Sequence, residues 1–167
     1  MAFSNHQIGI SLIELVITIA ILVILLSIAA PNYRIYMANQ RAQAVSYRLM
    51  ADLRNARSEA INKNTDCSLK ANASGWSAGW QIVDCGGNCT VDGTGCPAAR
   101  TVNASIWSIV EDNNYSKITF QASGRVDPNT AADFSICPTD TSVQIDQRRL
   151  IVSGSSITLN RLSPCEG

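Results

Sequence analysis

The most informative stretch of the sequence is GISLIELVITIAILVILLSIAAP, residues 9–31. Residues 10–30 are almost entirely apolar, and Glu14 is the only charged residue among them. At a rise of about 1.5 Å per residue, a helix of this length spans the roughly 30 Å hydrocarbon core of a bilayer. Pro31 follows at once, where it ends or kinks a helix. The stretch therefore predicts a transmembrane helix over residues 10–30.

A cleaved secretory signal and a simple single-pass anchor are the two alternatives for this segment. A secretory signal has a basic start and an apolar run of about 7–15 residues, whereas residues 1–9 carry no Lys or Arg and the run here is longer. A simple anchor does not explain Glu14, because a carboxylate in a membrane helix costs about 2.5–3.5 kcal/mol and is expected to be paired. A cut between Gly9 and Ile10 would create an α-amino group one helical turn from Glu14. Such an amine, on this chain or on a neighbour, is the expected partner.

The composition argues against several functional classes. The net charge is zero and charged residues make up 16% of the chain, so a globally basic nucleic-acid coat and an acidic disordered tail are excluded. The one histidine, His6, lies in the N-terminal segment, so the rest of the chain lacks the Ser–His and Cys–His pairs of nucleophilic catalysis. The sequence also lacks a Gly-rich phosphate loop. We therefore expect no enzyme and no cofactor.

The pattern changes twice after Pro31. Apolar residues first recur every three or four positions, which is typical of one helix face; they are Ala38, Ala42, Val45, Leu49, Leu53, Ala56 and Ala60. This pattern predicts a stem helix over residues 31–63 that continues the apolar helix and stops near Asn62–Asn64. Short β-like runs then follow, at residues 66–71, 80–84, 105–110, 117–121, 133–137, 149–153 and 156–160. The expected fold class is α+β, with one long helix packed on an antiparallel sheet.

Three arginines of the stem, Arg34, Arg41 and Arg48, recur every seven residues and therefore share one helix face. A solvated stripe is one interpretation. Contact with lipid headgroups, or with acidic heads of neighbouring subunits, is the other. By the positive-inside rule, Arg34 and Arg41 would place this end of the apolar segment in the cytoplasm.

The string GISLIEL that begins at Gly9 resembles the class III signal of type IV pilins and type II secretion pseudopilins. In that family a prepilin peptidase cuts after the glycine and methylates the new N-terminus, which the resemblance places at Gly9 and Ile10. It implies that Glu14 pairs with the amine of a neighbouring subunit during assembly. Pro31 falls where pilins carry a helix-loosening proline. Two departures are Ile10, where Phe or Met is usual, and a leader without Lys or Arg, which leaves the positive-inside conflict unexplained.

Several strings of the second half resemble the GspH/FimT/FimU branch of minor pilins. They are ARSEA at Ala56–Ala60, GWQIVD at Gly79–Asp84, ITFQASGRV at Ile118–Val126, FSIC at Phe134–Cys137 and RRLIVSG at Arg148–Gly154. The resemblance implies a type IV pilin-like fold with four parts. These are a leader at residues 1–9, a transmembrane segment at 10–30, a stem at 31–63 and a β-rich, disulfide-bonded periplasmic head at 64–167.

For function, the resemblance implies a FimU-like minor pilin that helps prime type IV pilus assembly and sits at or near the pilus tip. The implied partners are other minor pilins, the major pilin, prepilin peptidase and inner-membrane lipid. The chain would span the inner membrane once, with a periplasmic head, before it enters the pilus. The sibling alternative is a GspH-like minor pseudopilin of type II secretion, which would enter a pseudopilus.

The six cysteines point to an oxidising compartment or a metal site; they are Cys67, Cys85, Cys89, Cys96, Cys137 and Cys165. A zinc site is disfavoured because the head has no histidine and no paired C-x2-C spacing. Six cysteines allow 15 pairings, among which sequence does not choose. We favour Cys137–Cys165, which would tie the tail to the sheet, with the other four stapling the loop around residues 86–95.

DNA binding is a further alternative, because FimT-like members act in natural transformation through a C-terminal G-R-x-R-type motif. The matching stretch here is GSSIT at Gly154–Thr158, which has no arginine. The remaining cations nearby are Arg148, Arg149 and Arg161. A local patch of these three would contact phosphates, although the head as a whole carries more acidic than basic residues.

Overall fold

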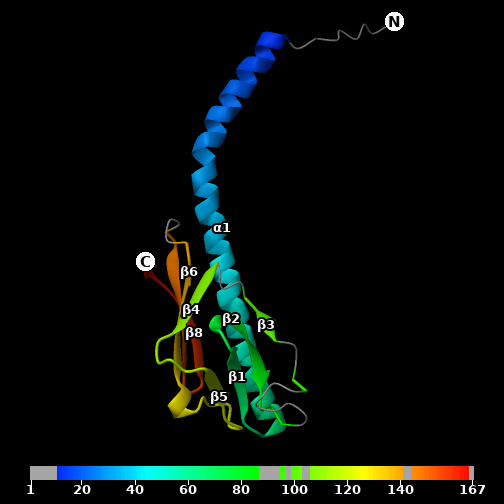
Figure 1. Ribbon diagram of the computed structural model, residues 1–167, viewed down its shortest axis with the longest axis vertical. Helices are drawn as coiled ribbons and strands as arrows, with labels where there is room; N and C mark the ends of the chain where they lie inside the picture. Colours follow the sequence, from blue (N-terminus) through cyan, green and yellow to red (C-terminus); the bar gives the residue numbers. More distant parts are fainter. Residues whose placement is uncertain (1–10, 87–94, 97–98, 103–105, 141–143, 166–167) are drawn as a thin grey trace, which may run out of the picture.

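The computed structural model describes residues 11–86, 95–96, 99–102, 106–140 and 144–165 (Figure 1). One helix, α1 (Leu12–Lys63), runs along the long axis of the molecule, and its C-terminal half packs against two sheets. The helix ends at Asn64, which adopts the left-handed conformation and donates its N–H to the carbonyls of Ala60 and Ile61. Lys63 lies in the last turn, where a cation interacts favourably with the helix dipole. The predicted stop at residues 62–64 is confirmed.

The helix is bent by 45° between the segments Leu12–Ile28 and Asn32–Lys63. Pro31 lies at this bend, and a proline inside a helix removes one backbone hydrogen bond and kinks the axis. Within the described residues, no single helix meets the length and hydropathy criteria for a membrane span, whereas these two bent segments meet them together.

The strands form two four-stranded antiparallel sheets. The first has the order β3 (Arg100–Thr101), β2 (Gly75–Val83), β1 (Cys67–Asn72), β5 (Lys117–Phe120). The second has the order β4 (Trp107–Glu111), β6 (Ala132–Pro138), β7 (Asp146–Ser153), β8 (Ser156–Pro164). A single 3-10 turn, η1 (Pro128–Thr130), precedes β6. The last two β-like runs predicted from the sequence, 149–153 and 156–160, form a hairpin: β7 and β8 pair from Ser153↔Ser156 onward, and Gly154 in the turn has a positive φ of 59°.

The sequence analysis expects one sheet, and the structure divides the strands between two. Each sheet presents an apolar face, and the two faces meet each other as well as α1. Trp76 of β2 meets Phe134 of β6 edge-on, with ring centroids 4.9 Å apart. At the same junction, Ile109 N of β4 donates to Ser77 Oγ of β2 over 2.8 Å. Hydrophobic periodicity alone does not report such a division, because strands of both sheets alternate in the same way.

The core lies between the stem and the two sheets. The stem face predicted from the apolar period is confirmed: all its members are buried except Ala38 and Val45, which are partly buried. The sheets contribute fully buried large side chains, namely Trp80, Phe120, Phe134 and Leu150. Burying one such side chain stabilises the fold by about 1.5–3 kcal/mol. The stem is therefore an integral part of the head's hydrophobic core.

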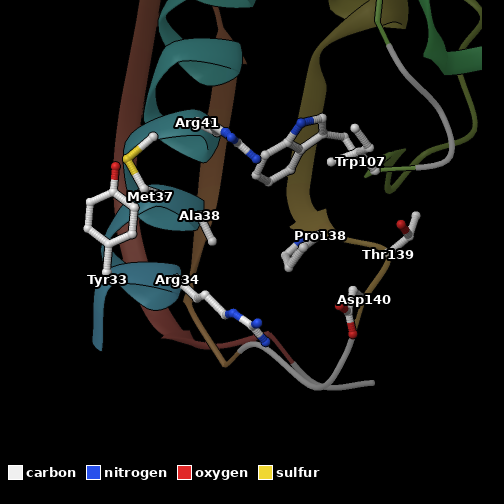
Figure 2. A pocket seen from close by; sticks show the side chains of 10 residues that line it. Tyr33, Arg34, Met37, Ala38, Arg41, Trp107, Pro138, Thr139 and Asp140 are labelled. Atoms are coloured by element: carbon white, nitrogen blue, oxygen red, sulfur yellow. The ribbon is translucent and has the colours of Figure 1, made fainter. Parts of the chain in front are cut away.

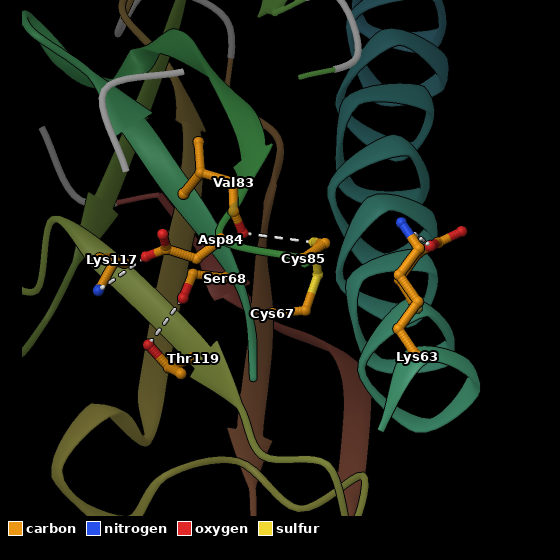
Figure 3. The surroundings of a disulfide bond; sticks show 9 residues. Lys63, Cys67, Ser68, Val83, Asp84, Cys85, Lys117 and Thr119 are labelled. Atoms are coloured by element: carbon orange, nitrogen blue, oxygen red, sulfur yellow. Dashed lines mark hydrogen bonds and ion pairs between the residues drawn. A yellow bond between two sulfur atoms is a disulfide. The ribbon is translucent and has the colours of Figure 1, made fainter. Parts of the chain in front are cut away.

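Two disulfides are described in the head. Cys137 at the end of β6 is bonded to Cys165 beyond β8, which is the pair that the sequence analysis favours. Cys67 at the start of β1 is bonded to Cys85 just after β2 (Figure 3). Cys85 directly precedes residues 86–95, the loop that the sequence analysis expects to be held by disulfides. Cys96 is also disulfide-bonded, and Cys89 lies outside the described residues. Nearby, Lys117 and Asp84 form an ion pair at 3.6 Å between β5 and the end of β2.

Removing the Cys137–Cys165 bridge is expected to destabilise the head. The two cysteines are 28 residues apart, and closing a loop of that length stabilises the native state by about 3.6 kcal/mol in the chain-entropy account. We expect the double variant Cys137→Ser/Cys165→Ser to unfold at clearly lower urea concentration, measured by circular dichroism on the full chain in detergent. Adding reductant to wild type should lower the midpoint at least as far. An unchanged midpoint in the double variant would show that the bridge contributes nothing to stability.

Candidate assembly site

The first half of α1 presents an apolar surface with no partner in this chain. Every large apolar side chain from Leu12 to Ile28 is more than half exposed, the least exposed being Ile17 at 51%. An apolar surface of this size is far larger than a soluble monomer normally exposes and marks a membrane or protein contact. The helix therefore requires an apolar environment that the head does not provide, either lipid or the helices of other subunits.

Glu14 is the one ionisable group in this apolar half, and it lies exposed in the first turn of α1. The spacing of Ser11 and Glu14 matches a capping box, in which the two residues would hydrogen-bond the helix N-terminus. The structure shows no side-chain cap at Ser11. In the described part of the chain, no cation forms an ion pair with Glu14. The carboxylate is therefore available to a group outside the described part of the chain.

The other polar side chains of the segment are satisfied within the helix. Thr18 Oγ1 donates to the carbonyl of Leu15 over 2.8 Å, and Ser27 Oγ donates to the carbonyl of Ile24 over 2.7 Å. Such i−3 bonds let a hydroxyl enter an apolar phase without an unpaired donor. Glu14 has no such bond among the described residues, which makes it the candidate functional group of the segment.

The remaining predicted assembly residues are placed only in part. Gly9 and Ile10, the expected cleavage and methylation positions, lie outside the described residues. Pro31 lies at the 45° bend of α1, where its backbone interrupts the regular helix. The structure thus places the exposed carboxylate and the bend on one element, with the bend between the apolar half and the head.

The structure does not bring the three arginines of the DNA alternative onto one face. Arg148 and Arg161 lie opposite each other in the β7–β8 register and so share a face of the second sheet. Arg149 is the neighbour of Arg148 along β7, and successive side chains of a strand point to opposite faces. Arg161 is ion-paired with Asp146. The three guanidinium groups therefore do not form one patch.

Arg149 is occupied by carboxylates of the outer face of the second sheet. Its Nε donates to both oxygens of Asp133, over 2.8 and 3.0 Å, and its Nη2 donates to Asp133 Oδ2 over 2.6 Å. Asp112 Oδ2 lies 3.5 Å from the same Nη2. The hydrogen bonds and charge of Asp133, with a smaller contribution from Asp112, raise the pKa of Arg149. The guanidinium therefore remains charged and is already paired within the head.

Two buried carboxylates were not singled out by the sequence analysis. Asp52, on the stem, accepts a hydrogen bond from Trp80 Nε1 over 2.8 Å. Glu111, 6% exposed, accepts from the backbone N–H groups of Tyr115 and Asp133. Both serve the fold, because a buried carboxylate must be hydrogen-bonded. In the ranges that the structure describes, no group of three or more His, Cys, Asp or Glu side chains is placed to hold a metal ion.

A long helix with an apolar, carboxylate-bearing first half and a second half packed on antiparallel sheets defines a type IV pilin-like subunit. The match to known families is more specific. Residues 46–156 match the GspH family, "Type II transport protein GspH", and this chain belongs to that family. Residues 4–30 match the "Prokaryotic N-terminal methylation motif". No curated protein matches the chain.

Solved structures show the same fold. The type IV minor pilin FimU of Pseudomonas aeruginosa superposes with a TM-score of 0.60 and 24% sequence identity, covering 78% of this chain and 99% of FimU. The minor pseudopilin EpsH from the type 2 secretion system of Vibrio cholerae gives a TM-score of 0.51 and 16% identity, covering 75% of this chain and 98% of EpsH. The pilin-like α+β fold expected from the sequence is confirmed.

Proposed function

We propose that this chain is a FimU-like minor pilin that helps to prime type IV pilus assembly and is incorporated at or near the pilus tip. The single observation that carries the proposal is the exposed apolar half of α1 with its one available carboxylate, Glu14. Membership of the GspH family and the match to the methylation motif support it. Its partners are other minor pilins and the major pilin, which present the same kind of helix.

The proposed mechanism begins with processing. Prepilin peptidase cuts after Gly9 and methylates the new amine of Ile10, so that a cation lies at the start of the apolar helix. Glu14 of one subunit then pairs with the amine of the next. Inside a bundle of apolar helices this pair is shielded from water, so a subunit that lacks either charge leaves the other buried and unpaired, which destabilises by about 3–5 kcal/mol.

The proposed location follows from the same segment. Before assembly, residues 10–30 span the inner membrane once, the stem at 31–63 rises from it, and the head at 64–167 lies in the periplasm. After assembly, helices of other subunits replace the lipid. The described disulfides fit an oxidising compartment such as the periplasm.

A GspH-like minor pseudopilin of type II secretion is the second candidate. The description of the matched family and the likeness to EpsH favour it. Both candidates use the same helix and the same carboxylate for assembly. They differ in the filament that the subunit enters, a type IV pilus or a type II secretion pseudopilus.

Deleting the gene separates the two candidates. We expect pilin sheared from the cell surface to fall strongly while type II secretion continues, and a plasmid copy of the gene to restore the pili. Normal surface pili together with lost secretion would instead assign the chain to the pseudopilus. Normal pili with normal secretion would overturn both proposals and leave DNA uptake as the next activity to measure.

A further inference from the structure

A groove lies where the stem leaves the head, on the side that faces the apolar half of α1. It has a volume of about 570 Å³ and runs between α1 and the segments around β4 and the end of β6 (Figure 2). Its walls include Tyr33, Arg34, Ala38, Arg41, Trp107 and Pro138. Figure 2 shows both arginine side chains extending from the helix into the groove, Arg41 toward Trp107 and Arg34 below Pro138 toward the end of the groove where Asp140 lies. The groove is therefore apolar with two cations inside it.

These two arginines have no carboxylate partner among the residues that the structure describes. Neither Arg34 nor Arg41 forms an ion pair or a side-chain hydrogen bond with any residue that the structure describes, in contrast to Arg149 and Arg161 of the head. One acidic residue, Asp140, lies at the rim of the groove, and it makes interactions of its own. Two guanidinium groups against one carboxylate leave the groove with a net positive charge, which complements an anion.

The groove also lies at the right height to meet a membrane surface. Arg34 and Arg41 are six and thirteen residues beyond Ile28, the last residue of the first helix segment. A helix rises about 1.5 Å per residue, and the stem is tilted by 45° from the first segment. Measured along the axis of that first segment, the two arginines therefore lie roughly 6 and 14 Å beyond its end, on the side of the head. Side chains of an α-helix tilt toward the helix N-terminus, so both arginine side chains start out toward the apolar segment. Tyr33 and Tyr36, which are 64% and 58% exposed, occupy the same zone, where tyrosines are enriched in membrane proteins.

We propose that, while the chain is anchored in the membrane, this groove binds the phosphate of an anionic phospholipid from the periplasmic leaflet. Arg34 and Arg41 hold the phosphate, and the apolar walls cover the glycerol and the upper part of the acyl chains. This inference rests on the membrane anchoring in the proposed function. It gives the positive residues beside the apolar segment a role, because a bound lipid fixes the head against the membrane before a neighbouring subunit replaces it.

The test compares two matched double variants of the full chain in mild detergent. Arg34→Gln/Arg41→Gln removes both charges of the groove, and Arg54→Gln/Arg125→Gln removes two exposed charges that lie outside the groove, one on the stem and one on the head. Each protein is titrated with phosphatidylglycerol or phosphatidylcholine, and bound lipid is counted by native mass spectrometry. An arginine near an anionic surface contributes about 1 kcal/mol, so we expect the groove variant to bind phosphatidylglycerol about 30-fold more weakly. The control variant should bind like wild type. Phosphatidylcholine carries the same phosphate with a choline cation beside it, so wild type should bind it more weakly than phosphatidylglycerol.

Several results would overturn the inference. Equal binding of the two lipids by wild type would show that the groove does not select an anionic lipid. An equal loss of phosphatidylglycerol binding in both variants would show that the lipid is attracted by the overall charge and not by this groove. Loss of a dimer, rather than of lipid, in the groove variant would mean that the groove receives the acidic head of a second copy. Flotation of wild type with phosphatidylcholine vesicles tests the anchor separately. A chain that floats but shows no lipid preference contradicts only this inference, whereas a chain that does not float contradicts the proposed function.

Discussion

Replacing Glu14 with alanine is expected to remove the chain almost completely from assembled filaments while the head stays folded. Glu14 is the only ionisable group in an otherwise exposed apolar helix half, and no described cation of the same chain pairs with it. In the assembled state, its loss would leave a neighbour's amine unpaired among apolar helices, at a cost of about 3–5 kcal/mol. We therefore expect the amount of chain in sheared filaments, relative to the amount in membranes, to fall at least about a hundredfold. Immunoblotting of the two fractions measures this ratio.

Two further variants show whether charge is responsible. Glu14→Gln keeps the size and polarity of the side chain but not its charge, so it should fail as completely as alanine. Thr18→Ala removes a hydroxyl that bonds only within the helix, to the carbonyl of Leu15, and should enter filaments normally. Wild-type incorporation of Glu14→Ala would refute the pairing mechanism.

Replacing Trp80 with alanine is expected to cause the largest loss of stability in the head. Trp80 is fully buried between the first sheet and the stem, and its Nε1 donates to Asp52 of α1 over 2.8 Å. Truncating a buried aromatic side chain costs about 3–5 kcal/mol, which is a large part of the roughly 5–15 kcal/mol that stabilises a typical domain. Urea unfolding of the full chain in detergent, followed by near-ultraviolet circular dichroism, should show this loss or no folded head at all.

A matched pair of milder variants isolates the hydrogen bond to the stem. Trp80→Phe and Trp76→Phe each remove one indole N–H from a nearly buried site. The partner of Trp80 is the Asp52 carboxylate, and the partner of Trp76 is the carbonyl of Tyr115. Hydrogen bonds to charged groups contribute about 1.5–3 kcal/mol, against about 0.5–1.5 kcal/mol for neutral ones. We expect Trp80→Phe to lose about twice as much stability as Trp76→Phe; equal losses would mean that Asp52 adds nothing to the docking of the stem.

Much of the fold could be predicted because the signals are local. The helix was expected to run from residue 10 to about residue 62, and it spans Leu12–Lys63, since an unbroken apolar period and the Asn62–Asn64 stop both act within a few residues. The last hairpin was equally clear, because Gly154 supplies the positive φ that its turn requires.

Strand boundaries were predicted less well where a glycine lies inside a strand. The strand expected at residues 80–84 begins at Gly75, five residues earlier. Gly79, which lies just before the predicted strand, is inside β2 with a φ of 116°. The two-residue strand β3 was not expected, because a strand so short has no periodicity to detect.

The long-range features of the candidate site could not be predicted from periodicity. The separation of Arg149 from Arg148 and Arg161 depends on the β7–β8 register and on the carboxylate of Asp133, sixteen residues away on the neighbouring strand. The groove around Arg34 and Arg41 is lined by residues about 70 to 100 positions farther along the chain, around Trp107 and Pro138, so it depends on tertiary structure. Glu14, by contrast, stood out in the sequence because a lone charge in an apolar run needs no tertiary structure to be noticed.

The central claim is that the chain becomes a filament subunit through a processed N-terminus that pairs with the carboxylate of a neighbour. Mass spectrometry of filaments sheared from cells tests it most directly. The account predicts that the sheared fraction contains this chain and that its first peptide begins at an N-methylated Ile10. Finding the chain only in membranes, with residues 1–9 still attached, would contradict it.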